Sequence, residues 1–481
     1  MFLESLGIYG WRPSDEKLLL AGLLTGDPVL LIGKSGSAKT LVIKALAQAL
    51  GLKGVTYDAS KSMFEDVLGF VNPAALKKGA VEYVESPITI WDKEVVFIDE
   101  LNRAAYEMQS KWLEIIRSRQ IMGLTTKVKW IFSAMNPFDY SATNALDDAL
   151  VSRFASFVYP PDVLDMCEAD AVAVTQHVNH DDAPAFSHWG GRVIAKQVDY
   201  GNVGAQINEL LIAAAKIYQD LLLSDIADTL PVFLSKFSVF AMKESKGAIA
   251  LDGRRLGFIM RTVLAVRAID LALSYKYGVV PPDFKQEAKS TVESCIPIAL
   301  SSNSIKKEEV LHIISGCFDL LKSYFDKTSD INTTNLIFEL FTTSDLLRKI
   351  DILLKNKLSD LVQTKAWESL IKGEDSAMVA FLCVHIEAVK PGTIPVELLS
   401  SFADTFGEIK LDGTFQLNFN GKDIDAVEEI TKLIHQKGNI NRMVIINRMG
   451  NQRNVLTTKA VNKIFTESDR LADFYEQIKS A

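Results

Sequence analysis

One stretch near the N-terminus constrains this chain more than any other. It consists of an apolar run at residues 29–32, a glycine-bearing segment at 33–38, and an apolar-periodic segment that opens at Lys39 and Thr40. This order predicts a buried strand, a tight loop and a helix. The N–H groups of such a loop and the positive end of the helix dipole converge on one place, which favours a bound phosphate. The stretch therefore predicts a phosphate-binding loop.

Two residues of this loop have chemistry suited to a nucleotide. We expect Lys39 to contact the β- and γ-phosphates and Thr40 to ligate Mg²⁺. Ala38 departs from the usual pattern, because a glycine normally precedes the lysine, and an alanine fits here only with a negative φ. The residues expected to bind the nucleotide are Gly33, Lys34, Ser35, Gly36, Ser37, Ala38, Lys39, Thr40 and Leu41.

A second apolar run, at residues 95–98, ends in the carboxylates Asp99 and Glu100. It predicts a central parallel strand with both acids at its carboxyl end, the edge at which α/β sheets bind ligands. Neighbouring residues of a strand point to opposite sides, so the two acids have different expected roles. Asp99 is expected to hold the Mg²⁺ shell, and Glu100 to orient and polarise the attacking water.

A third predicted strand, at residues 130–135, is followed by Asn136, whose amide is placed to contact a γ-phosphate or the water. A helix is expected over 105–117 and a hairpin over 119–129, and Arg153 follows as a candidate arginine finger.

The expected elements around these motifs are less constrained. Ile8 and Tyr9 precede the first helix and are expected to wall a nucleotide base; the alternative is that Tyr9 and Trp11 simply pack against the core. A strand is expected at residues 54–59, and a hairpin is expected to join 80–84 to 88–91.

Together these segments resemble the AAA+ ATPases, in particular their MoxR-like and midasin/dynein-related branch. The resemblance spans about residues 5 to 275, and the branch tolerates alanine before the loop lysine. The motifs that carry it are GKSGSAKT at 33–40, VVFIDELNRA at 95–104, FSAMNP at 132–137 and LDDALVSRF at 146–154.

The resemblance implies a role for each matching residue. Lys39 and Thr40 are the Walker A residues, Asp99 and Glu100 the Walker B residues, and Asn136 is sensor 1. Arg153 is a finger that acts on a neighbouring subunit, and Arg103 is a further inter-subunit arginine. Arg255 is sensor 2 at the start of a lid helix, with Arg254 as the alternative register, and the 119–129 hairpin precedes sensor 1.

We expect three regions in a chain of 481 residues. A parallel-sheet α/β core of the P-loop NTPase kind occupies residues 1–160, and an excursion followed by an α-helical lid occupies 161–300. A separate, mostly helical α+β region at 301–481 is expected to dock a partner or client. There, helices are predicted over 306–326, 336–361, 367–388, 423–436 and 458–479, and strands over 409–419 and 443–446.

Composition narrows the class of protein. Hydrophobic residues make up 48% and charged residues 23%, as in ordinary globular domains, and the net charge of −8 argues against a generally basic nucleic-acid surface. No apolar run reaches the length of a membrane span, and the N-terminus shows no evident signal peptide. The four widely spaced cysteines are expected to be reduced and buried, which favours a cytoplasmic protein.

The resulting hypothesis is an ATPase that assembles as a homo-oligomeric ring, expected to be a hexamer, and binds ATP and Mg²⁺ at the subunit interfaces. Such a protein would remodel a client, with a von Willebrand factor A-type partner supplied by another polypeptide. One alternative is a GTPase motor similar to McrB with a nucleic-acid-processing partner, because residues 135–139 are similar to its MNxxD segment. Another is a nucleotide-gated structural adaptor with little turnover.

Overall fold

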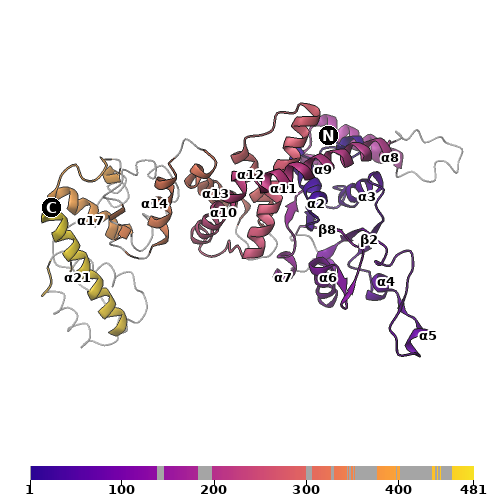
Figure 1. Ribbon diagram of the computed structural model, residues 1–481, viewed down its shortest axis with the longest axis horizontal. Coiled ribbons are helices and arrows are strands. Elements are labelled where there is room, and N and C mark those ends of the chain that lie inside the picture. The colour runs from indigo at the N-terminus through magenta and orange to yellow at the C-terminus, as the bar shows by residue number, and fades with distance from the viewer. Residues whose placement is uncertain are drawn as a thin grey trace. The chain divides into compact units, whose positions relative to one another are not determined.

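The computed structural model describes most of the chain and divides it into two compact units. The described residues are 2–137, 146–181, 198–298, 306–326, 330–343, 345, 348–349, 351–352, 376–396, 398–400, 436–438, 441, 445 and 458–480. One unit comprises Met1–Ser238 with Ser245–Ile314, and the other comprises Val239–Glu244 with Ser315–Ala481 (Figure 1).

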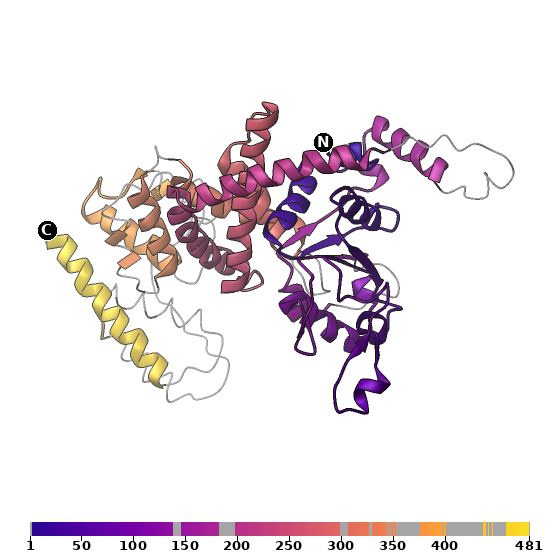
Figure 2. The same ribbon diagram turned by 45° about the vertical axis from the view of Figure 1, so that its right-hand side comes forward.

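A five-stranded sheet with strand order β2-β5-β8-β1-β9 forms the centre of the first unit. All four strand pairs are parallel, so the strands' carboxyl ends share one edge (Figure 2). This confirms the predicted P-loop NTPase type of α/β core. The strands are β1 (Val29–Ile32), β2 (Gly54–Asp58), β5 (Val95–Asp99), β8 (Trp130–Met135) and β9 (Ser156–Val158).

The register explains why polar residues from distant parts of the chain meet. Ile32 pairs with Met135, and Ile98 pairs with Ser133, so β1, β5 and β8 end at nearly the same level. Leu31 pairs with Val158 on the other side of β1. The segments that follow these four strands therefore emerge next to one another.

Helices cover the sheet and bury its apolar side chains. Trp112 of α6 is fully buried and belongs to the same hydrophobic cluster as Val96 and Ile98 of β5. The helices of this unit are α1 (Phe2–Ser5), α2 (Pro13–Thr25), α3 (Lys39–Ala49), α4 (Phe64–Leu68), α5 (Pro73–Leu76), α6 (Tyr106–Ser118), α7 (Asp148–Val151), α8 (Glu168–Asp181), α9 (Tyr200–Leu222), α11 (Gly253–Tyr277) and α12 (Phe284–Cys295), with 3₁₀ turns η1 (Leu101–Arg103) and η2 (Val163–Asp165).

The long helices α9 and α11 pack directly on the core. At Gly204 of α9, a Cβ atom would lie only 1.8 Å from the carbonyl oxygen of Ala49, so this approach requires a glycine. Helix α11 packs against α2, α9 and α12. Its Arg261 forms a two-bond ion pair with Asp27, with N–O distances of 2.8 and 3.0 Å. These contacts hold α11 on the core.

Two small hairpins project from the core. In one, β6 (Gln120–Ile121) pairs with β7 (Leu124–Thr125), which confirms the hairpin predicted over 119–129. In the other, β3 (Phe70–Val71) pairs with β4 (Tyr83–Val84). The prediction that 80–84 pairs with 88–91 was therefore wrong.

The segment that was expected to be the second strand of that hairpin is folded by side-chain bonds instead. Thr89 Oγ1 donates to the Ser86 carbonyl at 2.8 Å, and Trp91 Nε1 donates to the Leu68 carbonyl at 2.7 Å. Pro87 has no N–H to give to a strand ladder. This segment therefore forms a turn instead of a strand.

The second unit is helical where it is described. Phe240 packs edge-on against Phe338 and Phe341, with ring centroids 5.3 and 5.4 Å apart. Its elements are the end of α10 (Asp225–Glu244), the end of α13 (Lys307–Leu320), η4 (Lys322–Tyr324), α14 (Ile331–Thr342), α17 (Ser376–Val389) and α21 (Thr458–Ser480).

Several predictions for this region concern residues outside the described ranges. These are the strands expected at 409–419 and the helix expected at 423–436. Of the strand expected at 443–446, only Ile445 is described, and it is helical. None of the helices described here is both long and apolar enough to cross a membrane.

The cysteines differ in part from expectation. Cys295, Cys317 and Cys383 are buried thiols, as predicted, but Cys167 at the start of α8 is exposed. Its Sγ lies 3.2 Å from Asp170 Oδ2.

Candidate functional site

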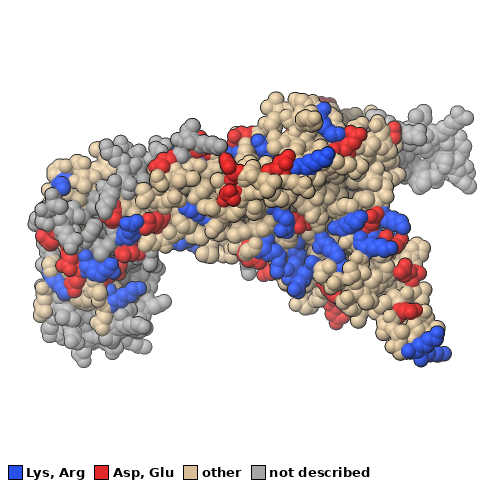
Figure 3. Space-filling view, in the orientation of Figure 1, with Lys and Arg blue, Asp and Glu red and all other residues tan. Residues whose placement is uncertain are grey.

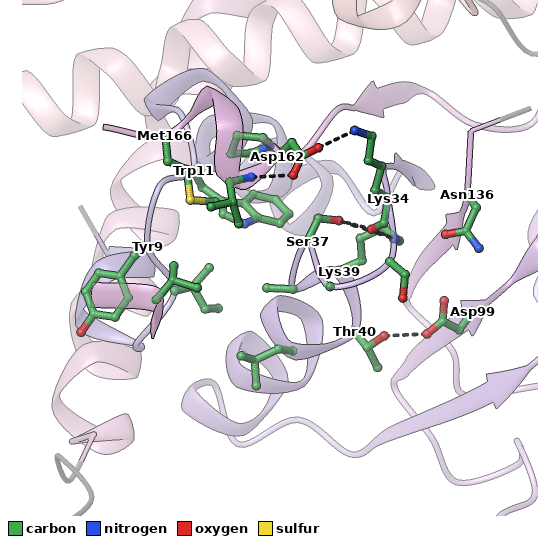
Figure 4. A pocket seen from close by; sticks show the side chains of 18 of the residues that line it. Tyr9, Trp11, Lys34, Ser37, Lys39, Thr40, Asp99, Asn136, Asp162 and Met166 are labelled. Carbon is green, nitrogen blue, oxygen red and sulfur yellow. Dashed lines mark hydrogen bonds and ion pairs between the residues drawn. The ribbon is translucent and has the colours of Figure 1, made fainter. Parts of the chain in front are cut away.

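A cavity of about 500 Å³ opens at the carboxyl edge of the sheet (Figure 4). The loop after β1 forms its floor, and the residues that follow β5, β8 and β9 form its sides. Its lining consists of Gly7, Ile8, Tyr9, Trp11, the run Lys34–Leu41, Asp99, Glu100, Met135, Asn136, Pro161, Asp162, Val163, Met166 and Val174.

The ammonium group of Lys39 lies inside this loop. Its Nζ donates to the carbonyl oxygens of Gly33 at 2.7 Å and Lys34 at 2.8 Å. Burial lowers the pKa of Lys39, while the charges of Asp99 and Glu100 oppose that shift. The loop thus presents a cation at the N-terminus of α3, where the helix dipole also favours an anion.

The backbone at Ala38 contradicts the expectation of a negative φ. Ala38 has φ 59° and ψ 19°, in the left-handed region. A Cβ in that region costs about 1–2 kcal/mol. The preceding Gly36 also has positive φ, 85°, and a Cβ there would meet nothing within 4 Å. The loop therefore bears strain at Ala38 but none at Gly36.

Thr40 and Asp99 meet at the deep side of the cavity and fit a magnesium ion. Thr40 Oγ1 donates to Asp99 Oδ2 at 2.5 Å, and Asp99 Oδ1 accepts from the Glu100 N–H at 2.9 Å. A hydroxyl and a carboxylate are the hard oxygen donors that Mg²⁺ prefers. The donor set thus matches the expected roles of both residues.

Glu100 begins a separate turn rather than continuing the strand. Strand β5 ends at Asp99, and Glu100 is left-handed with φ 53°. Arg103 Nη1 lies 3.1 and 3.2 Å from the two carboxylate oxygens of Glu100. Arg103 does not line the cavity. It was expected to reach a neighbouring subunit, and in this structure its bond is to Glu100 of its own chain.

Asn136 lines the cavity, and its backbone accepts a hydrogen bond from Asn102. Its side chain lines the cavity and is only 6% exposed, and its carbonyl oxygen accepts from Asn102 Nδ2 at 2.9 Å. This bond to the backbone carbonyl links the end of β8 to the turn after β5, so it holds the backbone from which the Asn136 side chain enters the cavity.

The other end of the cavity is apolar and suits a planar base. Ile8, Tyr9 and Trp11 line it from the N-terminal loop, and Met166 lines it from the segment before α8. These segments are in close contact, because a Cβ on Gly10 would lie 2.7 Å from Met166 Sδ. Of the two alternatives for Ile8 and Tyr9, the structure therefore places both residues at the cavity.

Asp162 is a cavity residue that sequence reasoning missed. Its Oδ2 lies 2.5 Å from Lys34 Nζ, so it joins the segment after β9 to the loop after β1. This bond lowers the pKa of the Asp162 carboxyl. The signal that could have found it is the strand Ser156–Val158, because a parallel strand beside β1 sends its following residues to the same edge.

Three arginines form a separate group, here named the arginine edge: Arg117, Arg153 and Arg254. None of them lines the cavity. Figure 3 shows basic side chains gathered over α7, next to which Arg153 lies. Arg153 Nε is buried and has no hydrogen-bond partner among the described residues. Its pKa is lowered first by burial and then by the charges of Arg254 and Arg117.

The sensor 2 expectation for Arg255 does not hold in this structure. The side chain is 5% exposed and does not line the cavity. Its guanidinium donates to the carbonyls of Phe154, Cys295 and Val151 at 2.5, 3.1 and 3.1 Å. Arg254, the alternative, lies outside the cavity too, with its Nη1 3.5 Å from Ser152 Oγ.

The chain is similar to known proteins over part of its length. Residues 28–154 match the family model of the AAA domain of the dynein-related subfamily. That range contains the loop, both acids, Asn136 and Arg153, whereas Arg254 and Arg255 lie beyond it.

Two curated proteins are similar over part of their length. "Structural protein ORF618" of Acidianus two-tailed virus is 30% identical over 152 residues, which are 30% of this chain and 24% of that protein. "Uncharacterized protein YeaC" of Bacillus subtilis is 28% identical over 142 residues, which are 28% of this chain and 43% of that protein. The chain thus covers less than half the length of either relative.

Among solved structures, a "putative ATPase" from Cytophaga hutchinsonii matches with 17% identity and a TM-score of 0.45. The match covers 65% of this chain and 92% of that one.

Proposed function

We propose that this chain, whose residues 28–154 form an AAA domain, hydrolyses ATP in a ring and uses the energy to remodel a protein client. One observation supports this most strongly. The cavity brings together Lys39, Thr40, Asp99, Glu100 and Asn136 within one chain, and the candidate finger Arg153 lies outside it. The missing positive charge would then come from the Arg153 of a neighbouring copy.

The residues of the cavity divide the chemistry among them. Lys39 and the N–H groups of the loop would bind the phosphates, and Asn136 would contact the γ-phosphate or the attacking water. Glu100 would orient that water and accept its proton once Arg103 is displaced from the carboxylate. Thr40 and Asp99 would hold Mg²⁺, which neutralises charge that develops on the phosphates.

The position and charges of the arginine edge favour a ring. Burial and the charges of Arg254 and Arg117 lower the pKa of Arg153, although the charge of Asp252 opposes this shift. A triphosphate of an adjacent subunit would relieve this, and arginine fingers contribute roughly 10³–10⁵ to the rate of phosphoryl transfer. A closed ring, of six subunits in this proposal, gives every cavity one such neighbour.

ATP is the nucleotide that the base end of the cavity favours. Guanine carries N–H donors that need acceptors. Asp162 is the carboxylate of that region among the described lining residues, and it is already paired with Lys34. The apolar side chains of Ile8, Tyr9 and Met166 discriminate little, but adenine has only its N6 amino group as a donor where guanine has N1–H and an N2 amino group, so adenine leaves fewer donors to satisfy.

The two hairpins are the proposed client contacts. Phe70 of β3 is 72% exposed and Met122 of the β6–β7 turn is 64% exposed. Tyr83 of β4 contacts Met122, with Oη 3.7 Å from Sδ, so the two hairpins form one apolar surface. Exposed apolar surface of this kind suits unfolded segments of a client. The second unit is proposed to bind a partner, such as a von Willebrand factor A-type protein.

Concentration dependence of turnover tests this proposal. Purified chain should hydrolyse ATP with a specific activity that rises as the ring assembles, and excess GTP should compete poorly. Glu100→Gln should assemble and bind ATP but lose about 10²–10⁴-fold in kcat. Glu107→Gln, the same change at an exposed residue of α6 that does not line the cavity, provides a matched surface control. Normal turnover by Glu100→Gln would remove the proposed mechanism.

A second candidate is a nucleotide-gated structural protein. The observation that favours it is the viral relative, which carries the name "structural protein". In that case ATP would drive assembly, and wild-type turnover would be no faster than that of Glu100→Gln.

A further inference from the structure

Arg255 contacts the backbone on both sides of Arg153. Its Nη2 donates to the Val151 carbonyl at 3.1 Å, and its Nη1 donates to the Phe154 carbonyl at 2.5 Å. Arg153 lies between these two residues, on the turn that follows α7, where Phe154 N donates to the Val151 carbonyl at 3.2 Å. The guanidinium therefore binds the turn that carries Arg153 without touching the Arg153 side chain.

The same guanidinium is fixed from the other side. Nη1 also donates to the Cys295 carbonyl at 3.1 Å, at the end of α12, and Asp252 Oδ1 accepts from the Arg255 N–H at 2.7 Å as the N-cap of α11. Rings of Phe157 and Phe258 lie 5.3 and 5.9 Å from the guanidinium carbon. One side chain thus joins α11, α12 and the Arg153 turn.

The neighbouring residue strengthens this arrangement. Arg254 Nη1 lies 3.5 Å from Ser152 Oγ, so two consecutive arginines at the start of α11 reach residues 151, 152 and 154. A buried arginine is costly unless its donors are used, and here a planar fork of donors serves three carbonyls. A lysine could not satisfy three acceptors in that geometry.

We propose that Arg255 is a positioning residue for Arg153: it fixes the turn so that Arg153 is presented to the cavity of the neighbouring subunit. This inference rests on the proposed function, because it requires Arg153 to act on a neighbour. Helix α11 would then take part in placing Arg153. A shift of the start of α11 within one subunit would move the finger offered to the next.

Arg255→Lys tests the proposal in homogeneous rings. A lysine keeps the charge and loses the fork, so kcat should fall about 10- to 100-fold, as expected when a catalytic group is displaced by roughly 1 Å. The KM for ATP should change less than about threefold, because the cavity contains no atom of Arg255. A raised KM with unchanged kcat would overturn the positioning role.

Mixed rings show whose cavity is affected. When Arg255→Lys subunits are mixed with Lys39→Ala subunits, the intact cavity of the former should receive a well-placed finger from the latter. Turnover should therefore exceed the sum of the two homogeneous rings. Turnover that stays at the sum would mean that Arg255 serves its own nucleotide, and the proposal would be wrong.

A double variant separates positioning from direct contact. If Arg255 acts only through Arg153, then Arg153→Ala/Arg255→Lys should have the same kcat as Arg153→Ala within about twofold. A further loss equal to that of Arg255→Lys alone would contradict the proposal. If Arg153→Ala itself leaves kcat unchanged, the proposed function fails instead, so the two failures are distinguishable.

A milder variant covers the case in which Arg255→Lys does not fold. Asp252→Ala removes the N-cap of α11 and loosens its first turn, but it leaves the guanidinium in place. It should give a smaller loss of kcat with the same recovery in mixed rings and the same absence of additivity with Arg153→Ala. Additive losses would again overturn the proposal.

Discussion

The nucleotide cavity and the arginine edge are both built from charged side chains, but they differ in how those charges are satisfied. In the cavity, Lys39 donates to two carbonyls and Thr40 donates to Asp99. At the arginine edge, Arg153 Nε has no hydrogen-bond partner among the described residues, and the charges of Arg254 and Arg117 lower the pKa of Arg153 against the opposing charge of Asp252. The polar side chains of the cavity thus have their partners within one chain, whereas the arginine edge is suited to an anion from outside.

Removal of the Arg153 side chain should have the largest effect. We expect Arg153→Ala to lower kcat by about 10³-fold or more, because a finger contributes roughly 10³–10⁵ to phosphoryl transfer. ATP affinity, measured by calorimetry, should stay within about threefold of the wild type. A comparable loss in affinity would mean that Arg153 contacts the nucleotide of its own chain, and the proposed difference between the cavity and the arginine edge would be wrong.

Removal of the cavity lysine should have the opposite signature. Lys39→Ala should weaken ATP binding at least about 100-fold, through the loss of charge-assisted bonds to the phosphates. Lys44→Ala is a matched control on the same helix, because Lys44 is exposed and does not line the cavity. Tight binding of ATP by Lys39→Ala would refute the placement of the phosphates.

A third region also contains buried polar atoms without a hydrogen-bond partner in the described part of the chain, but for a different reason. Asp270 Oδ2 and Glu287 Oε1 are buried and lack hydrogen bonds among the described residues, although Lys17 pairs with Asp270 and Arg267 with Glu287. Burial, and then the charge of Asp270, raise the pKa of Glu287 to about 7. Here a proton, rather than an anion from another chain, would supply the partner.

This region predicts a pH dependence with a defined sign. The pKa of Glu287 is 4.5 when unfolded and about 7 when folded, so the folded state binds more protons between these values. Stability should therefore fall by about 2–3 kcal/mol as the pH rises from 5 to 8. In Glu287→Gln, the stability measured by thermal unfolding should lack this part of its dependence on pH. An unchanged pH dependence would contradict the raised pKa of Glu287.

The smallest expected effect concerns strain in the cavity loop. Because Ala38 is left-handed, Ala38→Gly should raise the free energy of unfolding by about 0.5–1 kcal/mol, after allowance for the more flexible unfolded chain. Gly36→Ala is the matched reverse change and should destabilise by a similar amount. Denaturant unfolding measures both, and destabilisation by Ala38→Gly would show that the strain is absent.

The sequence predicts the core because buried parallel strands appear as apolar runs, and polar residues follow them. Lys39, Asp99 and Asn136 were found in this way. Strand β9 was missed because three residues, Ser156–Val158, are too few to show a pattern, and Asp162 was missed with it.

Other features depend on contacts that one sequence does not display. The φ of Ala38 follows from the path of the loop, and the pairing of β3 with β4 depends on side-chain bonds around Pro87. Arg254 and Arg255 are adjacent in sequence, and only their surroundings separate an exposed side chain from a buried one. The position of a finger relative to another subunit likewise cannot be read from a single chain.

The central claim is that Arg153 of one subunit completes the cavity of the next. The most direct measurement is the ATPase rate of rings assembled from Arg153→Ala and Lys39→Ala subunits in varied proportion. The account predicts a maximum at intermediate mixing, since an intact cavity then adjoins an intact finger. A rate that never rises above the weighted sum of the two inactive rings would contradict it.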